Sequence, residues 1–512
     1  MKRFNICLGS LLVAASPGFA ATCQSLTALV IPDVTVSTAT ATPAGPMSLP
    51  GAGQITVPEF CRVLAVARPS PDSEIHFEVW LPIAAAWNGK FEGTGNGGYS
   101  SALGYRPMAA ALNRGYATAG SDTGHEGGDL KFGIGHVEKI KDWAFRAVHV
   151  MTESAKLIVR DYYGKFPQYS YFNGCSTGGH QALTEAQRFP ADYDGIVAGA
   201  PANNRVHQTA GFLWSWLAIY KDPVDPLPAA KLPMITKAVV AACDAIDGLK
   251  DGIIDDPRRC NFDPAALQCK GADDGSCLTA LQVAAVRKIY DGAKNPRTGE
   301  QIFSGWVRGS EGFSEAQLGG WTGYIVGQKE PARTDFFRYW VFNDPNWDLR
   351  SFDFDRDLAY ADSKMAVVNS METNLMFFQS HKGKLLMYTG WADPVVPPME
   401  GIRYYESVQR AMGGPQKTAE FFRLFMVPGM GHCAGGPGPS AFDPVDALDK
   451  WVTQGAAPDK IIASHSTNGA VDRTRPLCPY PQVARYQGSG SIDEAANFTC
   501  MSEPARSSRR GE

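Results

Sequence analysis

Residues 174–178 read Gly-Cys-Ser-Thr-Gly, and they lie between a segment typical of a β-strand and a segment typical of a helix. A serine in a sharp strand-to-helix turn needs small residues two places before and after it, because the backbone passes too close for side chains. The N–H of Thr177 then points toward negative charge that develops near the serine, assisted by the helix N-terminus. The pattern predicts a nucleophile at Ser176, and a glycine-rich turn without chemistry is the alternative.

Strand-like and helix-like segments alternate on both sides of this turn. In the helix-like segment, Ala144, Val148, Met151, Ala155 and Ile158 recur at steps of three and four, which places them on one helix face. The alternation predicts an α/β fold with a mainly parallel sheet and helices on both faces. The predicted strands are 74–82, 115–122, 169–173, 196–200, 384–388 and 421–427, and the predicted helix is 139–163.

The middle of the chain has a different pattern. Residues 205–375 are rich in Trp, Asp, Gly and Pro, and strand patterns are hard to find there. We expect residues 21–204 and 376–512 to form the catalytic domain and residues 205–375 to form a lid inserted over the sheet. A separate binding domain is the alternative for the insertion. Residues 34–58 are rich in Thr, Ala, Pro and Gly and predict an irregular or short-stranded segment.

The first twenty residues have the features of a cleaved secretory signal. A basic start is followed by an apolar segment that is too short to span a bilayer, and Ala20 ends a small-residue cleavage site. Lipid attachment at Cys23 is the alternative. The formal charge of −4 argues against binding to nucleic acid or to anionic lipid through the global field. We therefore expect a secreted or periplasmic protein with no membrane anchor after signal cleavage and no nucleic-acid partner.

The cysteines agree with export. Ten of the eleven remain after signal cleavage, and this even number favours disulfides in an oxidising compartment. The sequence contains no Cys-x-x-Cys pair, which argues against a zinc site. Spacing alone does not give the connectivity, although close pairs such as Cys243/Cys260, Cys269/Cys277 and Cys478/Cys500 are candidates for local bonds.

Two residues far from Ser176 are candidates for its partners. Asp393 follows one predicted strand and His432 follows the next, in the order serine, acid, histidine that the strand–turn–helix serine motif favours. An Asp-Pro turn and a glycine-rich surface loop are the alternatives for Asp393 and His432. Cys175 precedes the serine and Cys433 follows the histidine, so a bond between these two cysteines would tie the serine turn to the histidine loop.

The three motifs together resemble the tannase and feruloyl esterase family, which includes mono(hydroxyethyl) terephthalate hydrolases. The matching segments are Gly-Cys-Ser-Thr-Gly-Gly at 174–179, Trp-Ala-Asp-Pro at 391–394 and Pro-Gly-Met-Gly-His-Cys at 428–433. The resemblance implies an α/β-hydrolase fold with a large lid between nucleophile and acid. It also implies the disulfides Cys175–Cys433, Cys23–Cys61, Cys243–Cys260, Cys269–Cys277 and Cys478–Cys500.

The glycine-rich segment 92–99 is expected to supply the second oxyanion donor, since a glycine lets backbone approach a substrate closely. The resemblance points to Gly98 for this role, with Gly97 next. A phosphate-binding loop is disfavoured, because no Lys-Ser/Thr pair follows these glycines.

Residues 244–256 place carboxylates at short, regular spacing, with glycines at the bends. Calcium takes several oxygen ligands from one compact loop, although this spacing is not that of an EF-hand, and an acidic surface loop is the alternative. The resemblance implies a structural Ca²⁺ in the lid. Its ligands would be the side chains of Asp244, Asp247 and Asp251 and the carbonyls of Leu249 and Ile253.

These features predict a serine carboxylesterase that hydrolyses aromatic esters through an acyl-enzyme. By the resemblance, feruloyl esters rank first, gallate esters second and terephthalate monoesters third. A terephthalate monoester needs a cation for its free carboxylate; Arg308 is the sequence candidate, while Val396 stands where an aromatic is expected. A catalytically silent surface or carbohydrate-binding protein is the alternative from another class. Candidate aromatic walls of the substrate pocket, with a core role equally open, are Trp306, Trp321 and Tyr324.

Overall fold

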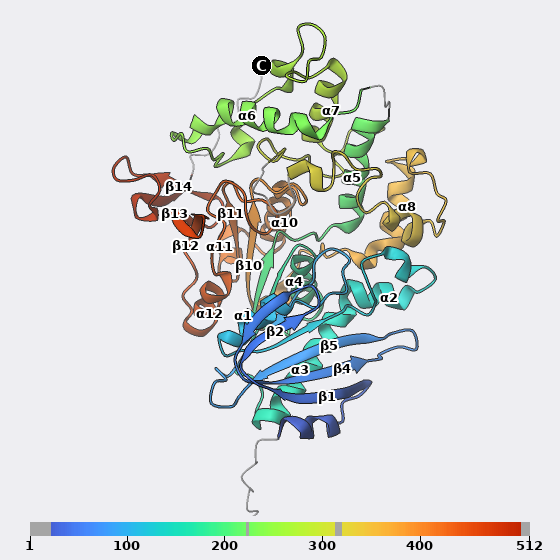
Figure 1. The fold of residues 1–512 in the computed structure, drawn as a ribbon, viewed down its shortest axis with the longest axis vertical. Helices are drawn as coiled ribbons and strands as arrows, with labels where there is room; N and C mark the ends of the chain where they lie inside the picture. Colours follow the sequence, from blue (N-terminus) through green and yellow to red (C-terminus); the bar gives the residue numbers. More distant parts are fainter. Residues whose placement is uncertain (1–21, 222–224, 313–319, 503–512) are drawn as a thin grey trace, which may run out of the picture.

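The computed structural model describes residues 22–221, 225–312 and 320–502. The predicted signal, residues 1–20, lies outside these ranges. Within them, a nine-stranded sheet forms the centre of the molecule (Figure 1). In spatial order its strands are β1 (Val34–Thr42), β4 (Phe60–Ala67), β5 (Ile75–Pro82), β7 (Ala117–Ser121), β6 (Lys90–Thr94), β8 (Tyr169–Cys175), β9 (Gly195–Gly199), β10 (Lys384–Gly390) and β11 (Phe422–Val427).

The sheet is mixed. The first three strands in the order run antiparallel to their neighbours, and the six from β7 to β11 run parallel to one another. All six strands predicted from the sequence are present, with bounds that shift by at most a few residues. Because parallel strands share a direction, the loops that follow β6, β8, β10 and β11 gather at one edge of the sheet.

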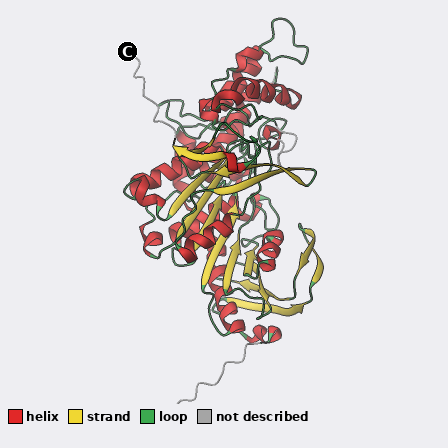
Figure 2. Ribbon diagram, turned by 90° about the vertical axis from the view of Figure 1, so that its left-hand side faces the viewer, coloured by secondary structure: helices red, strands yellow, loops and turns green. Residues whose placement is uncertain are grey.

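Helices cover both faces, as the twisted sheet between two helical layers shows in Figure 2. On β10, Leu385 and Met387 pack with α3 (Ala147–Tyr163), α4 (Thr177–Arg188) and α10 (Pro398–Ala411). Leu386 and Tyr388 point to the other face and pack with α1 (Tyr105–Asn113) and α12 (Pro444–Gln454). The strand is therefore apolar on both sides, as a central parallel strand should be. Among the helices of the described residues, none has the length and hydrophobicity needed to cross a bilayer.

The predicted helix 139–163 is interrupted. The chain forms α2 (Val137–Lys141), then a π-helical turn over Asp142–Arg146, and only then α3. The extra residue in the π turn rotates the helix face. As a result Ala144 packs in a cluster with residues of the segment 205–375, whereas Val148 packs on the sheet, so the single apolar face predicted for these two residues was wrong.

The N-terminal segment is more regular than its composition indicates. It contains β1, which extends the central sheet, and a hairpin of β2 (Gly45–Leu49) and β3 (Gly53–Val57). At the other end of the chain, two further hairpins pair β12 (Ile461–Thr467) with β13 (Ala470–Leu477) and β14 (Gln482–Tyr486) with β15 (Phe498–Ser502). Short helices α9 (Met376–Ser380) and α11 (Pro415–Ala419) flank β10 and β11.

The chain leaves the sheet after β9 and returns to it at β10. The described part of this long insertion contains helices and turns but no named β-strand. Figure 1 shows α6 and α7 beyond the end of the sheet, on the side away from β1. Two apolar clusters fill the insertion, one of which includes Trp306 and Trp321. Its main helices are α5 (Arg205–Tyr220), α6 (Leu232–Cys243), α7 (Ala280–Asp291) and α8 (Arg356–Met365).

Candidate active site

Ser176 occupies a strained turn between β8 and α4. Its φ of 65° lies in the left-handed region, which a residue with a side chain adopts only when its surroundings enforce it. A Cβ on Gly174 would lie 2.5 Å from the Gly178 carbonyl oxygen, and a Cβ on Gly179 would lie 2.2 Å from the Gly199 carbonyl oxygen. These glycines are therefore required by close backbone approach, and the turn leaves Ser176 half-buried at the end of the strand.

His432 and Asp393 form the contact expected of an oriented base. His432 Nδ1 lies 2.8 Å from Asp393 Oδ2, and the Asp393 side chain is fully buried. The other carboxylate oxygen of Asp393 accepts hydrogen bonds from the N–H groups of Val395 and Val396, at 2.8 and 2.9 Å. Because a carboxylate only accepts, Nδ1 donates the proton and Nε2 is left as the basic atom of the ring.

A covalent bond ties Ser176 to this pair. Cys175 and Cys433 form a disulfide with their Cα atoms 6.0 Å apart. Since successive Cα atoms are about 3.8 Å apart, the Cα atoms of Ser176 and His432 lie within about 14 Å of each other. The structure thus joins Asp393 to His432 by a hydrogen bond and brings Ser176 to the same loop by the disulfide. Within the described ranges, no hydrogen bond joins Ser176 Oγ to His432.

The five predicted disulfides are all formed, which confirms the pairing implied by the resemblance. The other four close shorter stretches of chain than the Cys175–Cys433 bond, whose sequence separation is 258. They are Cys23–Cys61, Cys243–Cys260, Cys269–Cys277 and Cys478–Cys500.

The two predicted oxyanion donors are neighbours. Thr177 Oγ1 donates a 2.7 Å hydrogen bond to the carbonyl of Gly98, which follows β6 and has a φ of 57°. The next carbonyl, of Tyr99, accepts a 2.9 Å hydrogen bond from His125 Nε2. Burial lowers the pKa of His125, so its ring is neutral. Through this hydrogen bond His125 holds the Gly98–Tyr99 segment.

The three candidate aromatic residues lie in different environments. Trp321 is fully buried in the core of the insertion, where its Nε1 donates to Ser310 Oγ. Trp306 is also buried, and its Nε1 donates a 2.7 Å bond to the carbonyl of Pro394, beside Asp393. Tyr324 is half-buried and stacks on Phe212. Of the three, Tyr324 offers an accessible ring, and substrate contact stays a prediction for all of them.

Two arginines that were not predicted from the sequence lie beside Gly98 and Tyr99. We call these two residues the oxyanion segment, because Gly98 is one of the predicted oxyanion donors. Arg205 donates a 2.5 Å hydrogen bond to Thr177 Oγ1, and its guanidinium carbon lies 5.5 Å from the centre of the Tyr99 ring. Arg333 lies 5.3 Å from the same ring and donates to the Tyr324 hydroxyl. A Cβ on Gly98 would lie 2.7 Å from an Arg333 nitrogen. Arg205 comes shortly after β9, at the edge where the other site loops gather. Its position after a parallel strand was the one feature of the sequence that could have indicated a place in the site.

The acidic segment 244–256 is a compact loop in which aspartate side chains accept hydrogen bonds from backbone N–H groups of the same loop. Asp244 accepts hydrogen bonds from the N–H groups of Asp251 and Gly252, and Asp247 accepts one from Leu249. Burial, together with neighbouring carboxylates, raises the pKa of Asp247 and brings that of Asp255 to about 7. Crowded, partly buried carboxylates in a loop that also carries backbone carbonyl oxygens are a donor set that suits a hard cation.

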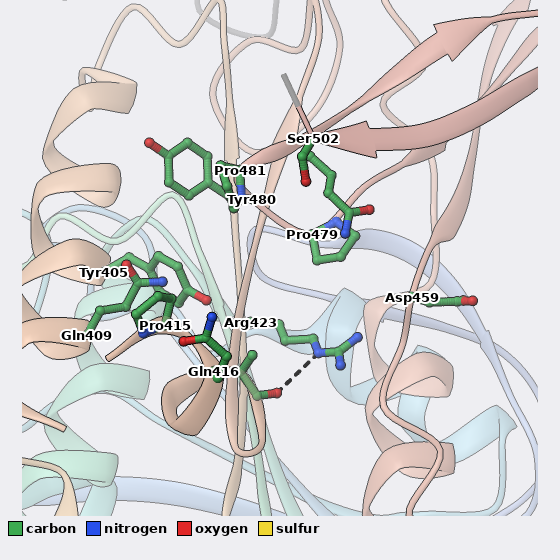
Figure 3. Close-up of a pocket in the computed structure, with 12 residues that line it drawn as sticks. Tyr405, Gln409, Pro415, Gln416, Arg423, Asp459, Pro479, Tyr480, Pro481 and Ser502 are labelled. Atoms are coloured by element: carbon green, nitrogen blue, oxygen red, sulfur yellow. Dashed lines mark hydrogen bonds between the residues drawn. The ribbon is translucent and has the colours of Figure 1, made fainter. Parts of the chain in front are cut away.

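A separate cavity of about 360 Å³ lies away from these residues. Figure 3 shows it bordered by Tyr405 and Gln409 of α10, by Tyr480 and by Arg423, which donates to the carbonyl of Ala419. Arg423 lies near the start of β11, whereas His432 follows the end of that strand. The cavity therefore belongs to the opposite edge of the sheet. Among the described residues that line it, none is Ser176, Asp393 or His432.

The chain is similar to known proteins along most of its length. The model of the family described as tannase and feruloyl esterase matches residues 61–501. An uncharacterized esterase of Xanthomonas campestris pv. campestris is 42% identical, with 98% of this chain and 95% of the relative covered. Mono(2-hydroxyethyl) terephthalate hydrolase of Piscinibacter sakaiensis is 35% identical over 88% and 86% of the two chains. The crystal structure of feruloyl esterase B from Aspergillus oryzae superposes with a TM-score of 0.86 at 30% identity, over 94% of this chain and all of that one.

The disulfide beside the serine has a testable energetic role. Replacing Cys175 and Cys433 together by serine should cost on the order of 5 kcal/mol of unfolding free energy in the chain-entropy model, because the closed loop is so long. Esterase activity should fall with it, since the serine and histidine loops lose their tether. Chemical denaturation and hydrolysis of an aryl ester measure the two effects.

The matched control is the double replacement of Cys269 and Cys277. Their disulfide has a sequence separation of only 8, so it closes a short loop. The same model gives about 2.5 kcal/mol for it, and its turnover should stay at the wild-type value. Equal stability losses in the two variants, with activity kept in both, would contradict the proposed role of the tether.

Proposed function

Because the chain belongs to the tannase and feruloyl esterase family and is a carboxylic ester hydrolase, we propose that Ser176, His432 and Asp393 are its catalytic triad. The observation that carries this proposal is the buried Asp393–His432 hydrogen bond, one residue from the Cys175–Cys433 disulfide that leads directly to Ser176. All three residues follow parallel strands at the same edge of the sheet.

In the proposed reaction, His432 Nε2 takes the proton of Ser176 Oγ as the oxygen attacks the ester carbonyl carbon. Asp393 keeps the imidazole in the tautomer that allows this and stabilises the imidazolium. The N–H groups of Thr177 and Gly98 donate to the tetrahedral oxyanion. The intermediate then expels the alcohol, which takes the proton from His432, and an acyl-enzyme remains. Water activated by the same histidine releases the acid and restores Ser176.

We propose hydroxycinnamate esters of the feruloyl type as the substrates. The supporting observations are the likeness to feruloyl esterase B over nearly the whole chain and the aromatic surface of Tyr324 near the oxyanion segment. Gallate esters are the alternative within the same reaction. The predicted signal and the five disulfides support export to the periplasm or the medium.

One observation favours a terephthalate monoester as a second candidate. Arg333 lies against Gly98 and pairs with no carboxylate in the part of the chain that the structure describes, so its charge is available to an anionic acyl group. Arg308, the sequence candidate, donates instead to the carbonyl of Phe262 and lies over the Tyr290 ring.

We also propose a structural calcium ion in the segment 244–256. The side chains of Asp244, Asp247 and Asp251 and the carbonyls of Leu249 and Ile253 would hold it. Cys243 and Cys260 bracket the loop with a disulfide. From the C-terminal hairpins, Arg475 donates a 2.6 Å bond to Asp251 Oδ2, so the loop also joins the insertion to the rest of the chain.

Ser176→Ala should abolish hydrolysis of methyl ferulate, methyl gallate and a terephthalate monoester, because no other group can form the acyl-enzyme. Release of the acids by the purified wild-type and variant proteins measures this, with circular dichroism as a control for folding. Full activity of the variant on any of these esters would refute the triad. Inertness of both proteins, with binding to polysaccharide, would favour the silent binding protein.

The second candidate has its own discriminating variant. Arg333→Gln should raise KM for mono(2-hydroxyethyl) terephthalate at least tenfold if Arg333 binds its free carboxylate, since an ion pair of that kind contributes more than a neutral contact. KM for methyl ferulate, which carries no carboxylate, should change less than threefold. Equal changes for the two esters would remove the specific argument for an anionic substrate.

Chelation tests the calcium site. Treatment with EDTA should lower the midpoint of thermal unfolding by several degrees, because an ion bound only to the native loop stabilises that state. Added Ca²⁺ should restore the midpoint, and Asp247→Asn should abolish the response. The matched control is Asp274→Asn, an exposed carboxylate in another turn of the insertion, which should keep the response. An unchanged midpoint with no calcium by elemental analysis would reject the site.

A further inference from the structure

The Arg205 guanidinium is a buried charge without a counter-charge. The residue is 5% exposed, and within the described part of the chain its polar contact is with a hydroxyl and not with a carboxylate. Its one hydrogen bond to protein goes to Thr177 Oγ1, and its Nε is buried with no acceptor. Burying a cation without a partner costs several kcal/mol, so such a residue is retained against stability.

The surroundings of this charge are aromatic or cationic. The guanidinium carbon lies 5.5 Å from the Tyr99 ring centre and 5.2 Å from that of Trp143, so two aromatic faces hold it. The Arg333 guanidinium carbon also lies close to the Tyr99 ring, 5.3 Å from its centre. Burial, with a further contribution from Arg333, lowers the pKa of Arg205 to about 10, and the group stays charged at neutral pH.

The single hydrogen bond of Arg205 reaches the segment where the oxyanion would form. The Thr177 hydroxyl accepts from Arg205 and donates to the carbonyl of Gly98, so it bridges the two residues whose N–H groups are the proposed donors. With the hydroxyl fixed from one side by the guanidinium, its proton is directed to Gly98. The relative position of the two donors then depends on Arg205.

We propose that Arg205 is a positioning residue of the oxyanion hole, which it orders through the Thr177 hydroxyl and whose negative intermediate its unpaired charge stabilises. The inference rests on the proposed function, because it takes Ser176 as the nucleophile. It explains why a chain would keep an unpaired cation in a buried, aromatic environment. A preorganised positive charge in a low-dielectric site acts on the transition state more strongly than on a neutral ester.

The test compares two arginine-to-methionine variants. Arg205→Met should lower kcat for methyl ferulate on the order of 10- to 100-fold, less than or equal to the loss of a direct oxyanion donor, with KM changed less than threefold. Its thermal midpoint should be unchanged or higher, because an uncompensated buried charge has been removed. The matched control Arg62→Met removes an arginine that is paired bidentately with buried Glu78. It should lower the midpoint and leave kcat unchanged.

Two further variants separate positioning from a general packing role. Thr177→Val removes the bridging hydroxyl and should reproduce the part of the kcat loss that comes from ordering the two donors, and the double variant with Arg205→Met should lose less than the product of the two single losses. Arg205→Lys keeps the charge and should recover part of the activity. Phenylboronic acid, which forms an anionic tetrahedral adduct with an active-site serine, should bind Arg205→Met more weakly by about the factor lost in kcat.

Wild-type kcat and boronate affinity in folded Arg205→Met and Thr177→Val would overturn the inference while Ser176→Ala remains inactive. Activity of Ser176→Ala would instead overturn the proposed function. A rise in KM with kcat unchanged would show that Arg205 binds ground-state substrate, and it would also overturn the positioning role.

Discussion

Close backbone approach around Ser176 is the constraint on which the site depends. A Cβ on Gly95 would lie 2.5 Å from the Cα of Gly178, and the clashes at Gly174 and Gly179 are of the same size. Backbone strain at a positive φ costs of order 1–3 kcal/mol, and surrounding contacts must impose it. Here the Ser176 N–H donates to the Gly199 carbonyl and the Gly178 N–H donates to the Asn96 carbonyl, so β9 and the segment after β6 fix the turn from both sides.

This constraint explains why much of the site could be predicted from sequence. A serine among obligatory glycines, at a strand-to-helix boundary, leaves a local signature, and so do Asp393 and His432 at the ends of apolar strands. Spacing alone gave candidate disulfide pairs, but the complete set was predictable only through family resemblance, because ten cysteines permit many connectivities. The π turn at Asp142–Arg146 was not predictable from periodicity, since a one-residue insertion in a helix changes the face without changing composition.

The charged residues around the oxyanion segment had no comparable signature. Arg333 reaches Gly98 from the insertion, and its place depends on how that insertion packs over the sheet. Arg205 is adjacent to Thr177 only because α5 starts at the edge where β8 and β9 end. A lone arginine at the start of a helix carries no local pattern that separates it from a surface residue. The segment 34–58 was predicted only as irregular or short-stranded, whereas β1 is a nine-residue strand of the central sheet, and pairing with β4 decides its conformation.

The distribution of matched and unmatched charge gives the site its chemical character. Where the insertion meets the C-terminal hairpins, Arg475 pairs with Asp251 and Arg473 pairs with Asp493, so those guanidiniums are neutralised in the resting structure. Around the Tyr99 ring, two guanidiniums are held by aromatic faces and hydroxyls and meet no carboxylate among the described residues. A carboxylate at that place would satisfy the cations and reduce the positive potential at Thr177 and Gly98. In the mechanism that we propose, the absence of a carboxylate there leaves this positive potential to act on a negative charge that exists only while an ester carbonyl is tetrahedral. A charge of that kind is stabilised in the transition state more than in the bound substrate.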